Sequence, residues 1–162
     1  MGNKTLIYRQ KIEQNLAESK KHLKRVNDAF SQIKKKYKIP LDKEDYQKIQ
    51  KDLSALAYSD QIIYRFSKLQ DSMGAKLFKS TLLFQGENIN KPFLDILNTL
   101  EKMEIINVDD WFEIRDLRNE IAHEYDENSN LTADIINMIY ELKSELQTVL
   151  NKIETLLKNS TN

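Results

Sequence analysis

Apolar and small residues in the first forty positions recur at alternating steps of four and three residues. This period places them on one stripe of a helix about seven turns long. The stripe consists of Ile12, Leu16, Ser19, Leu23, Val26, Phe30, Ile33 and Tyr37. Because Pro40 disfavours the α conformation in the residue before it, the pattern predicts one long helix over about residues 4–38.

A second helical pattern begins near Asp42 and runs to about Phe84. Its apolar positions are Ile49, Leu53, Leu56, Ile63, Phe66, Leu69, Met73 and Leu77. Polar residues and turn formers around Tyr58–Asp60 predict an interruption within this pattern. Gly86 and the two polar residues after it predict the C-terminal end of the helix.

Two shorter helices are predicted next. Pro92 suits the first turn of a helix that carries the apolar positions of Phe93–Met103. Either Asn107 or Asp109 can cap the following helix, which we expect to end near Tyr125.

The last part of the chain completes a helical pattern. The composition of residues 126–130 predicts a loop, and Thr132 is a candidate N-cap for the final helix. The apolar stripe of that helix is Ile135, Ile139, Leu142, Leu146, Val149, Ile153 and Leu156. Five helices with short links and no strand-like alternation predict an all-α fold, an up-and-down four- to five-helix bundle. We expect one domain over residues 1–162.

The composition supports a globular helical chain. Apolar residues make up 40% and charged residues 31% of the sequence, and 3 Gly and 2 Pro are too few for the turns of an all-β fold. The absence of Cys excludes disulfides and thiolate nucleophiles. The first eleven residues carry no signal-like apolar run, and no stretch approaches the ~20 apolar residues of a membrane span. We therefore expect a cytoplasmic protein with no membrane contact.

The formal net charge of zero hides an asymmetry. Residues 1–60 carry 14 basic and 8 acidic side chains, whereas residues 61–162 carry 11 and 17. Two basic runs account for most of the excess: Lys20, Lys21, Lys24 and Arg25, and then Lys34, Lys35, Lys36 and Lys38. They indicate either a helix that faces a polyanion or a solvated outer face. His22 lies within the first run, and we expect it to be exposed.

Most catalytic motifs are missing from the chain. The three glycines are not grouped into a phosphate-binding loop, and the two histidines, His22 and His123, are not neighbours that could hold a metal together. We therefore expect no bound metal and no other cofactor.

Residues 111–125 form the one segment with a candidate site. On a helical wheel, three apolar residues share a sector that should face the core: Ile114, Leu117 and Ile121. Four acidic residues share the opposite sector: Glu113, Asp116, Glu120 and Glu124. The arc between these sectors carries Arg115, Arg118, Asn119, Ala122 and His123. Asn119 and His123 are neighbours at i and i+4, and the long side chain of Arg118 can reach towards them past the small Ala122.

A guanidinium, an amide and an imidazole on one arc suit phosphodiester chemistry. Arg can bind two phosphate oxygens at once, and His gives or accepts a proton near neutral pH. RNA carries its own nucleophile, the 2′-hydroxyl, so this chemistry requires no metal. A two-fold dimer that joined two copies of this face would supply Arg118, Asn119 and His123 twice.

The order Arg118-x-x-x-x-His123-x-Tyr125, with Arg115 before it and Asn119 directly after Arg118, resembles the signature of the HEPN superfamily. It is most similar to the branch of toxins that pair with a small nucleotidyltransferase antitoxin. The local match covers residues 111–125, and the order of the predicted helices is consistent with that family over most of the chain.

The resemblance implies a HEPN-like bundle that dimerises through the motif helices. It implies metal-independent RNA cleavage that leaves a 2′,3′-cyclic phosphate, with Arg118, Asn119 and His123 as the catalytic group and Arg115 in support. It further implies that Tyr125 is the tyrosine to which a nucleotidyltransferase partner adds AMP in order to silence the toxin.

Two other functions stay open at this point. The acidic residues beside the motif favour a non-catalytic subunit that binds a nucleotide or substrate for a separate nucleotidyltransferase. The long apolar stripes of the first and last helices are also typical of a structural or adaptor bundle.

Overall fold

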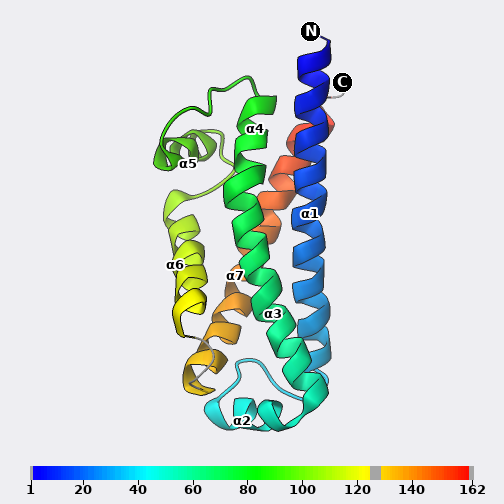
Figure 1. The fold of residues 1–162 in the computed structure, drawn as a ribbon, viewed down its shortest axis with the longest axis vertical. Helices are drawn as coiled ribbons and strands as arrows, with labels where there is room; N and C mark the ends of the chain where they lie inside the picture. Colours follow the sequence, from blue (N-terminus) through cyan, green and yellow to red (C-terminus); the bar gives the residue numbers. More distant parts are fainter. Residues whose placement is uncertain (1, 125–128, 161–162) are drawn as a thin grey trace.

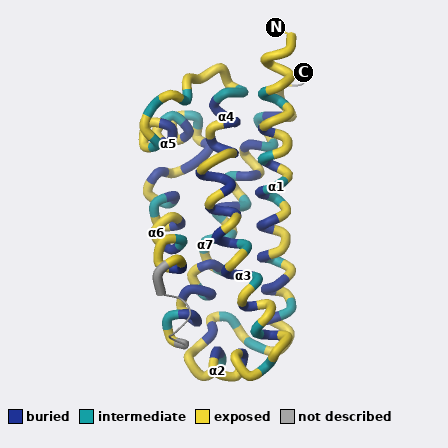
Figure 2. Tube along the Cα trace, in the orientation of Figure 1, coloured by how far each residue is buried: buried dark blue, intermediate teal, exposed yellow. Residues whose placement is uncertain are grey.

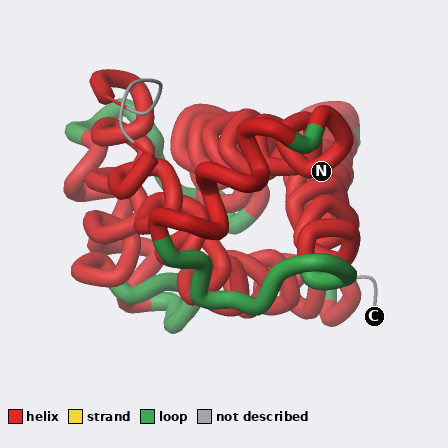
Figure 3. Tube along the Cα trace, turned by 90° about the horizontal axis from the view of Figure 1, so that it is seen from below, coloured by secondary structure: helices red, strands yellow, loops and turns green. Residues whose placement is uncertain are grey.

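The computed structural model of the chain describes residues 2–124 and 129–160, apart from the side chains of residues 123, 124 and 129. Its helices are α1 (Asn3–Ile33), α2 (Lys43–Lys51), α3 (Leu53–Ser72), α4 (Phe78–Phe84), α5 (Phe93–Lys102), α6 (Val108–Glu124) and α7 (Ser129–Asn159). A π-helical segment, Met73–Leu77, joins α3 to α4. Over the described residues the chain forms helices and loops without a strand (Figure 3), which confirms the all-α class.

The long elements run alternately down and up the molecule: α1 descends, α3 and α4 return, α6 descends and α7 returns (Figure 1). Helix α1 packs most closely along α3, and α7 contacts α1, α2, α3 and α6. The buried residues line the inward faces of these helices (Figure 2) and form one continuous core. None of the described helices combines the length and apolarity of a membrane span.

Helix α1 confirms the predicted stripe but ends earlier than expected. Every stripe residue from Ile12 to Ile33 is buried, whereas Tyr37 is only half-buried. The helix stops at Ile33, and the N–H of Tyr37 donates to the Ile33 carbonyl at 2.9 Å in a turn. The chain then reaches α7, where the side chain of Asn137 bonds both the N–H and the C=O of Leu41, at 2.7 and 2.8 Å. This contact with a distant helix could not be predicted from local periodicity.

The predicted interruption at Tyr58–Asp60 is wrong. The break lies at Asp52, whose backbone is extended and whose carboxylate accepts from the N–H of Ala55 at 3.3 Å, so that Asp52 caps α3. Ser59 is fully buried within α3. Because the extended residue resets the helical phase, Leu53 leaves the predicted stripe and is 84% exposed.

Helix α7 begins three residues before the predicted N-cap. Thr132 lies inside the helix and is buried, so its assignment as the N-cap is wrong, while residues 126–128 of the predicted loop lie outside the described residues. The α7 stripe itself is confirmed. Its members are all buried or packed against the core: Ile135, Ile139, Leu142, Leu146, Val149, Ile153 and Leu156.

His22 is buried, which contradicts the expected exposure. Its Nδ1 atom lies 3.1 Å from Nη1 of Arg65 on α3. Because a guanidinium only donates, Nδ1 accepts this bond and carries no proton. Burial, and then the positive charge of Arg65, lower the pKa of His22. His22 therefore links α1 to α3 as a neutral side chain.

The π-helical segment makes room for α6. Gly74 lies in this segment, and a Cβ atom added to it would lie 3.3 Å from Cζ2 of Trp111. The indole of Trp111 also packs edge-on against Phe78, with the ring centroids 4.6 Å apart. Because Gly74 has no side chain, Trp111, the bulkiest residue of α6, packs directly against the continuous rod formed by α3, the π-helical segment and α4 (the α3–α4 rod).

Gly74→Val should reduce the free energy of unfolding by about 1–3 kcal/mol more than Ala75→Val, because only the former crowds Trp111. Ala75 is exposed in the same segment, so its substitution reports the effect of a Val side chain at an uncrowded position. Helix propensity alone would make Ala75→Val the more destabilising change, because Ala is a better helix former than Gly. Urea unfolding monitored by circular dichroism measures both variants. Equal losses would contradict the close packing of Trp111 on Gly74.

Candidate functional site

Helix α6 is fixed at its start by two side-chain caps. Oδ1 of Asn107 accepts from the N–H of Asp110 at 3.0 Å, and the Glu101 carboxylate accepts from the N–H of Val108 at 2.8 Å. Of the two predicted caps, Asn107 is therefore the one used. Below Trp111, the predicted core sector is confirmed, since Ile114, Leu117 and Ile121 are all buried.

The arc that carries the motif lies on the surface. Arg115, Asn119 and Ala122 are exposed, and Arg118 retains 27% of its side-chain surface. The orientation of α6 thus agrees with the helical wheel. His123 lies in the last turn of α6, but its side chain, like the whole of Tyr125, lies outside the described residues.

Arg118 forms a two-point ion pair with Asp71 of α3. Nε of Arg118 donates to Oδ1 and Nη2 donates to Oδ2, both at 3.1 Å. Asp71 lies 47 positions earlier in the chain, so sequence reasoning missed it. No spacing rule within α6 points to a partner on α3.

This ion pair orients the guanidinium without enclosing it. The side chains of Arg118 and Asp71 are 27% and 47% exposed, so water screens their attraction. The pair uses Nε and Nη2, and none of the residues that the structure describes accepts from Nη1. Nη1 is the nitrogen through which Arg118 would bind a phosphate oxygen while it stays paired with Asp71.

The acidic sector borders this arc and faces α7. Glu113, Asp116 and Glu120 are exposed, but they lie beside the core sector at Leu117, whereas the helical wheel had predicted that they lie opposite it. With Glu141 of α7 they surround a cavity of about 290 Å³ whose apolar walls are Leu117, Met138 and Leu142. The field along this side of α6 is negative.

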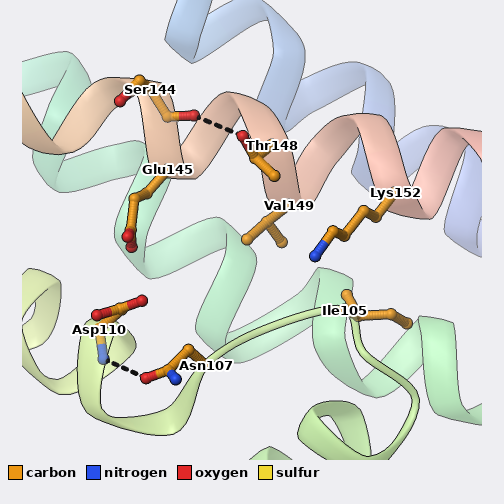
Figure 4. A pocket seen from close by; sticks show the side chains of 8 residues that line it. All are labelled: Ile105, Asn107, Asp110, Ser144, Glu145, Thr148, Val149 and Lys152. Carbon is orange, nitrogen blue, oxygen red and sulfur yellow. Dashed lines mark hydrogen bonds between the residues drawn. The ribbon is translucent and has the colours of Figure 1, made fainter.

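A second cavity, of about 230 Å³, lies between the start of α6 and the middle of α7. In Figure 4, Glu145 and Lys152 extend into it from α7, and Asp110 faces Glu145 from α6. Burial, followed by the nearby carboxylates of Asp110 and Glu113, raises the pKa of Glu145. Carboxylates therefore also line the N-terminal end of α6, together with the ammonium group of Lys152.

The described residues contain no cluster of three or more His, Asp or Glu side chains that could hold a metal ion. Comparisons of the chain with protein-family models, curated proteins and solved structures found no match.

Glu145→Gln should increase the free energy of unfolding at pH 7, by less than about 1 kcal/mol. The substitution removes a charge that burial and two carboxylates disfavour. Because the folded-state pKa is raised, this unfavourable charge is present above that pKa and is relieved as the pH falls through it. The advantage of the variant should thus shrink on acidification, as measured by thermal unfolding at several pH values.

Glu141→Gln, one turn earlier on α7, is the matched control and should have a smaller effect at pH 7. If Glu145→Gln destabilised the protein at pH 7, repulsion between Glu145 and Asp110 would be excluded.

A double-mutant cycle with Asp71→Asn and Arg118→Gln should give a coupling energy below about 1 kcal/mol. The coupling should weaken as salt is added, because both side chains are partly exposed. Urea unfolding of the four proteins measures it. A salt-independent coupling of about 3 kcal/mol or more would instead make the pair a structural link.

Proposed function

We propose that this protein is a metal-independent endoribonuclease toxin of the HEPN type. The observation that carries the proposal is the position of Arg118. Its guanidinium lies on the exposed arc of α6, is oriented by Asp71, and belongs to the same arc as Asn119. The motif resemblance adds His123, one turn further along the helix than Asn119.

In the proposed reaction, Arg118 binds two oxygens of the scissile phosphate and neutralises the charge that develops on them. A His123 imidazole accepts the proton of the 2′-hydroxyl as the 2′-oxygen attacks phosphorus. The bond from phosphorus to the 5′-oxygen breaks, and that oxygen takes a proton from an acid. The products are a 2′,3′-cyclic phosphate and a 5′-hydroxyl.

A homodimer supplies the acid. General base and general acid must act on opposite sides of the phosphorus, and one chain brings a single motif histidine. In the proposed dimer, a two-fold axis passes through the exposed arc of α6, so that the same surface of each chain meets its copy. The second His123 then protonates the leaving oxygen. Asp71 acts as a positioning residue because it holds Arg118 without touching substrate.

The proposal includes a second protein that silences the nuclease. A nucleotidyltransferase antitoxin in the cytoplasm transfers AMP from ATP to the hydroxyl oxygen of Tyr125, two residues beyond His123, and releases pyrophosphate and the hydroxyl proton. In this proposal, the added AMP acts in two ways. Its bulk keeps RNA out of the site, and its negative charge repels the phosphates of an RNA strand.

The acidic sector favours a second candidate function. Glu113, Asp116 and Glu120 are exposed along α6 and repel a nucleic-acid backbone. A nucleotide-binding subunit that presents its ligand to a nucleotidyltransferase needs the arginine but no RNA channel. This candidate predicts nucleotide binding that depends on Arg118, without RNA cleavage.

Arg118→Gln and His123→Gln should each reduce RNA cleavage at least about 100-fold, because each removes a group that acts on the phosphate or its protons. The purified protein is incubated with single-stranded RNA in excess EDTA, and 2′,3′-cyclic phosphate ends are measured. Growth arrest on expression should be relieved by the same two variants.

Lys102→Gln, which removes an exposed positive charge from α5, is the control and should cleave like the unmodified chain. Cleavage that chelation abolishes, or that survives both motif substitutions, would exclude the proposed mechanism. Nucleotide binding without any cleavage would establish the second candidate.

A further inference from the structure

A basic hollow lies where α1 ends, away from the residues assigned above. Its volume is about 410 Å³, which is within the range of ligand-binding sites. It is lined by Lys34, Lys35, Lys36, Tyr37, Lys38 and Ile39 of the turn after α1 and by Tyr140 of α7. Four of these seven residues are lysines, and two are tyrosines.

The positive charge of this basic hollow is largely uncompensated. Lys36 pairs with Asp52 at 3.1 Å, and it is the only one of the four lysines that pairs with a carboxylate among the described residues. Lys34 donates to the Tyr140 hydroxyl at 3.0 Å, and Lys35 donates to the Gln32 amide oxygen at 3.1 Å. The hydrogen bond and charge of Lys34, with a contribution from Lys143, lower the pKa of Tyr140. The field within the hollow is therefore positive.

The walls of the hollow are held by core contacts. Tyr140 packs edge-on against the buried Phe30, with the ring centroids 5.1 Å apart. The side chain of Asn137, one turn earlier on α7, bonds both backbone groups of Leu41. The basic turn is thus fastened to α7 at both of its ends, and forming the hollow costs little further ordering when a ligand binds.

We propose that the basic hollow binds the phosphates of a single-stranded RNA. Lysines act as point charges for a strand backbone, and Tyr37 adds an aromatic ring to the same wall. The ring of Tyr140 is engaged by Lys34 and Lys143, whose Nζ atoms lie 5.3 and 5.0 Å from its centroid. A lipid surface is less well matched, because the lysines surround a concavity instead of forming a projecting edge.

This inference deepens the proposed function, since it names a second contact for the RNA substrate. The C-terminal end of α6, the start of α7 and the turn after α1 all lie in the lower half of the molecule in Figure 1. In this proposal, the attraction of an RNA strand to the basic hollow offsets its repulsion by the acidic residues of α6.

The test is binding of a labelled, fully 2′-O-methylated RNA of about 12 nucleotides, measured by fluorescence anisotropy. This strand lacks the 2′-hydroxyl, so it binds but cannot be cleaved. Lys34→Gln combined with Lys38→Gln should weaken binding about tenfold near 0.1 M salt. The slope of log K against log salt should fall in magnitude by about 1.4, which corresponds to two phosphate contacts.

Lys4→Gln combined with Lys11→Gln is the matched control. It removes the same charge from exposed positions near the other end of α1 and should change binding less than twofold. Equal weakening by the two pairs would overturn the proposal, because it would show a diffuse effect of net charge. Binding to phosphatidylserine vesicles that needs Lys34 and Lys38, without a matching loss of RNA binding, would also overturn it.

The outcome is separate from that of the cleavage experiment. If the RNA binding depends on Lys34 and Lys38 but no strand is cleaved, the basic hollow stands and the nuclease proposal fails. If cleavage depends on Arg118 and His123 but RNA binding does not depend on Lys34 and Lys38, the nuclease proposal is supported and the basic hollow is not its RNA contact.

Discussion

The packing of Trp111 against Gly74 sets the position of α6, and the candidate site depends on it. The π-helical segment and the absence of a side chain at Gly74 bring the indole against the α3–α4 rod. The core sector of α6 then continues along α3, which brings Arg118 within hydrogen-bond distance of Asp71. A shift of α6 would separate these two side chains, because a two-point ion pair tolerates little displacement.

Charge divides the lower half of the molecule into two kinds of surface. The side of α6 that faces α7 is acidic around Glu113, Asp116 and Glu120, and the turn after α1 is basic around Lys34 and Lys38. Both surfaces border α7, which therefore separates opposite fields. A nucleic-acid strand approaching this region is attracted to one side and repelled from the other, so its path over the protein is restricted.

Local periodicity was sufficient to predict the all-α class and most of the buried helix faces, but not all of the helix boundaries. The stripe of α1 up to Ile33 and the core sector of α6 follow from spacing alone, because burying an apolar face is what holds a helix in a bundle. The break at Asp52 was missed because a single extended residue between two helical patterns leaves no glycine or proline as a signal. The burial of His22 and the partner of Arg118 were missed for another reason. His22 contacts Arg65, and Arg118 contacts Asp71. Both partners belong to α3 and are brought close only by the tertiary fold.

The carboxylate of Asp71 already occupies one edge of the Arg118 guanidinium, so any incoming anion meets a tethered competitor. The local concentration of a side chain fixed in this way is far above that of a free monovalent ion. Under the proposed function, a chain of linked phosphates would gain from several contacts at once and a single monovalent ion from one, so the ion pair would favour the polyanion.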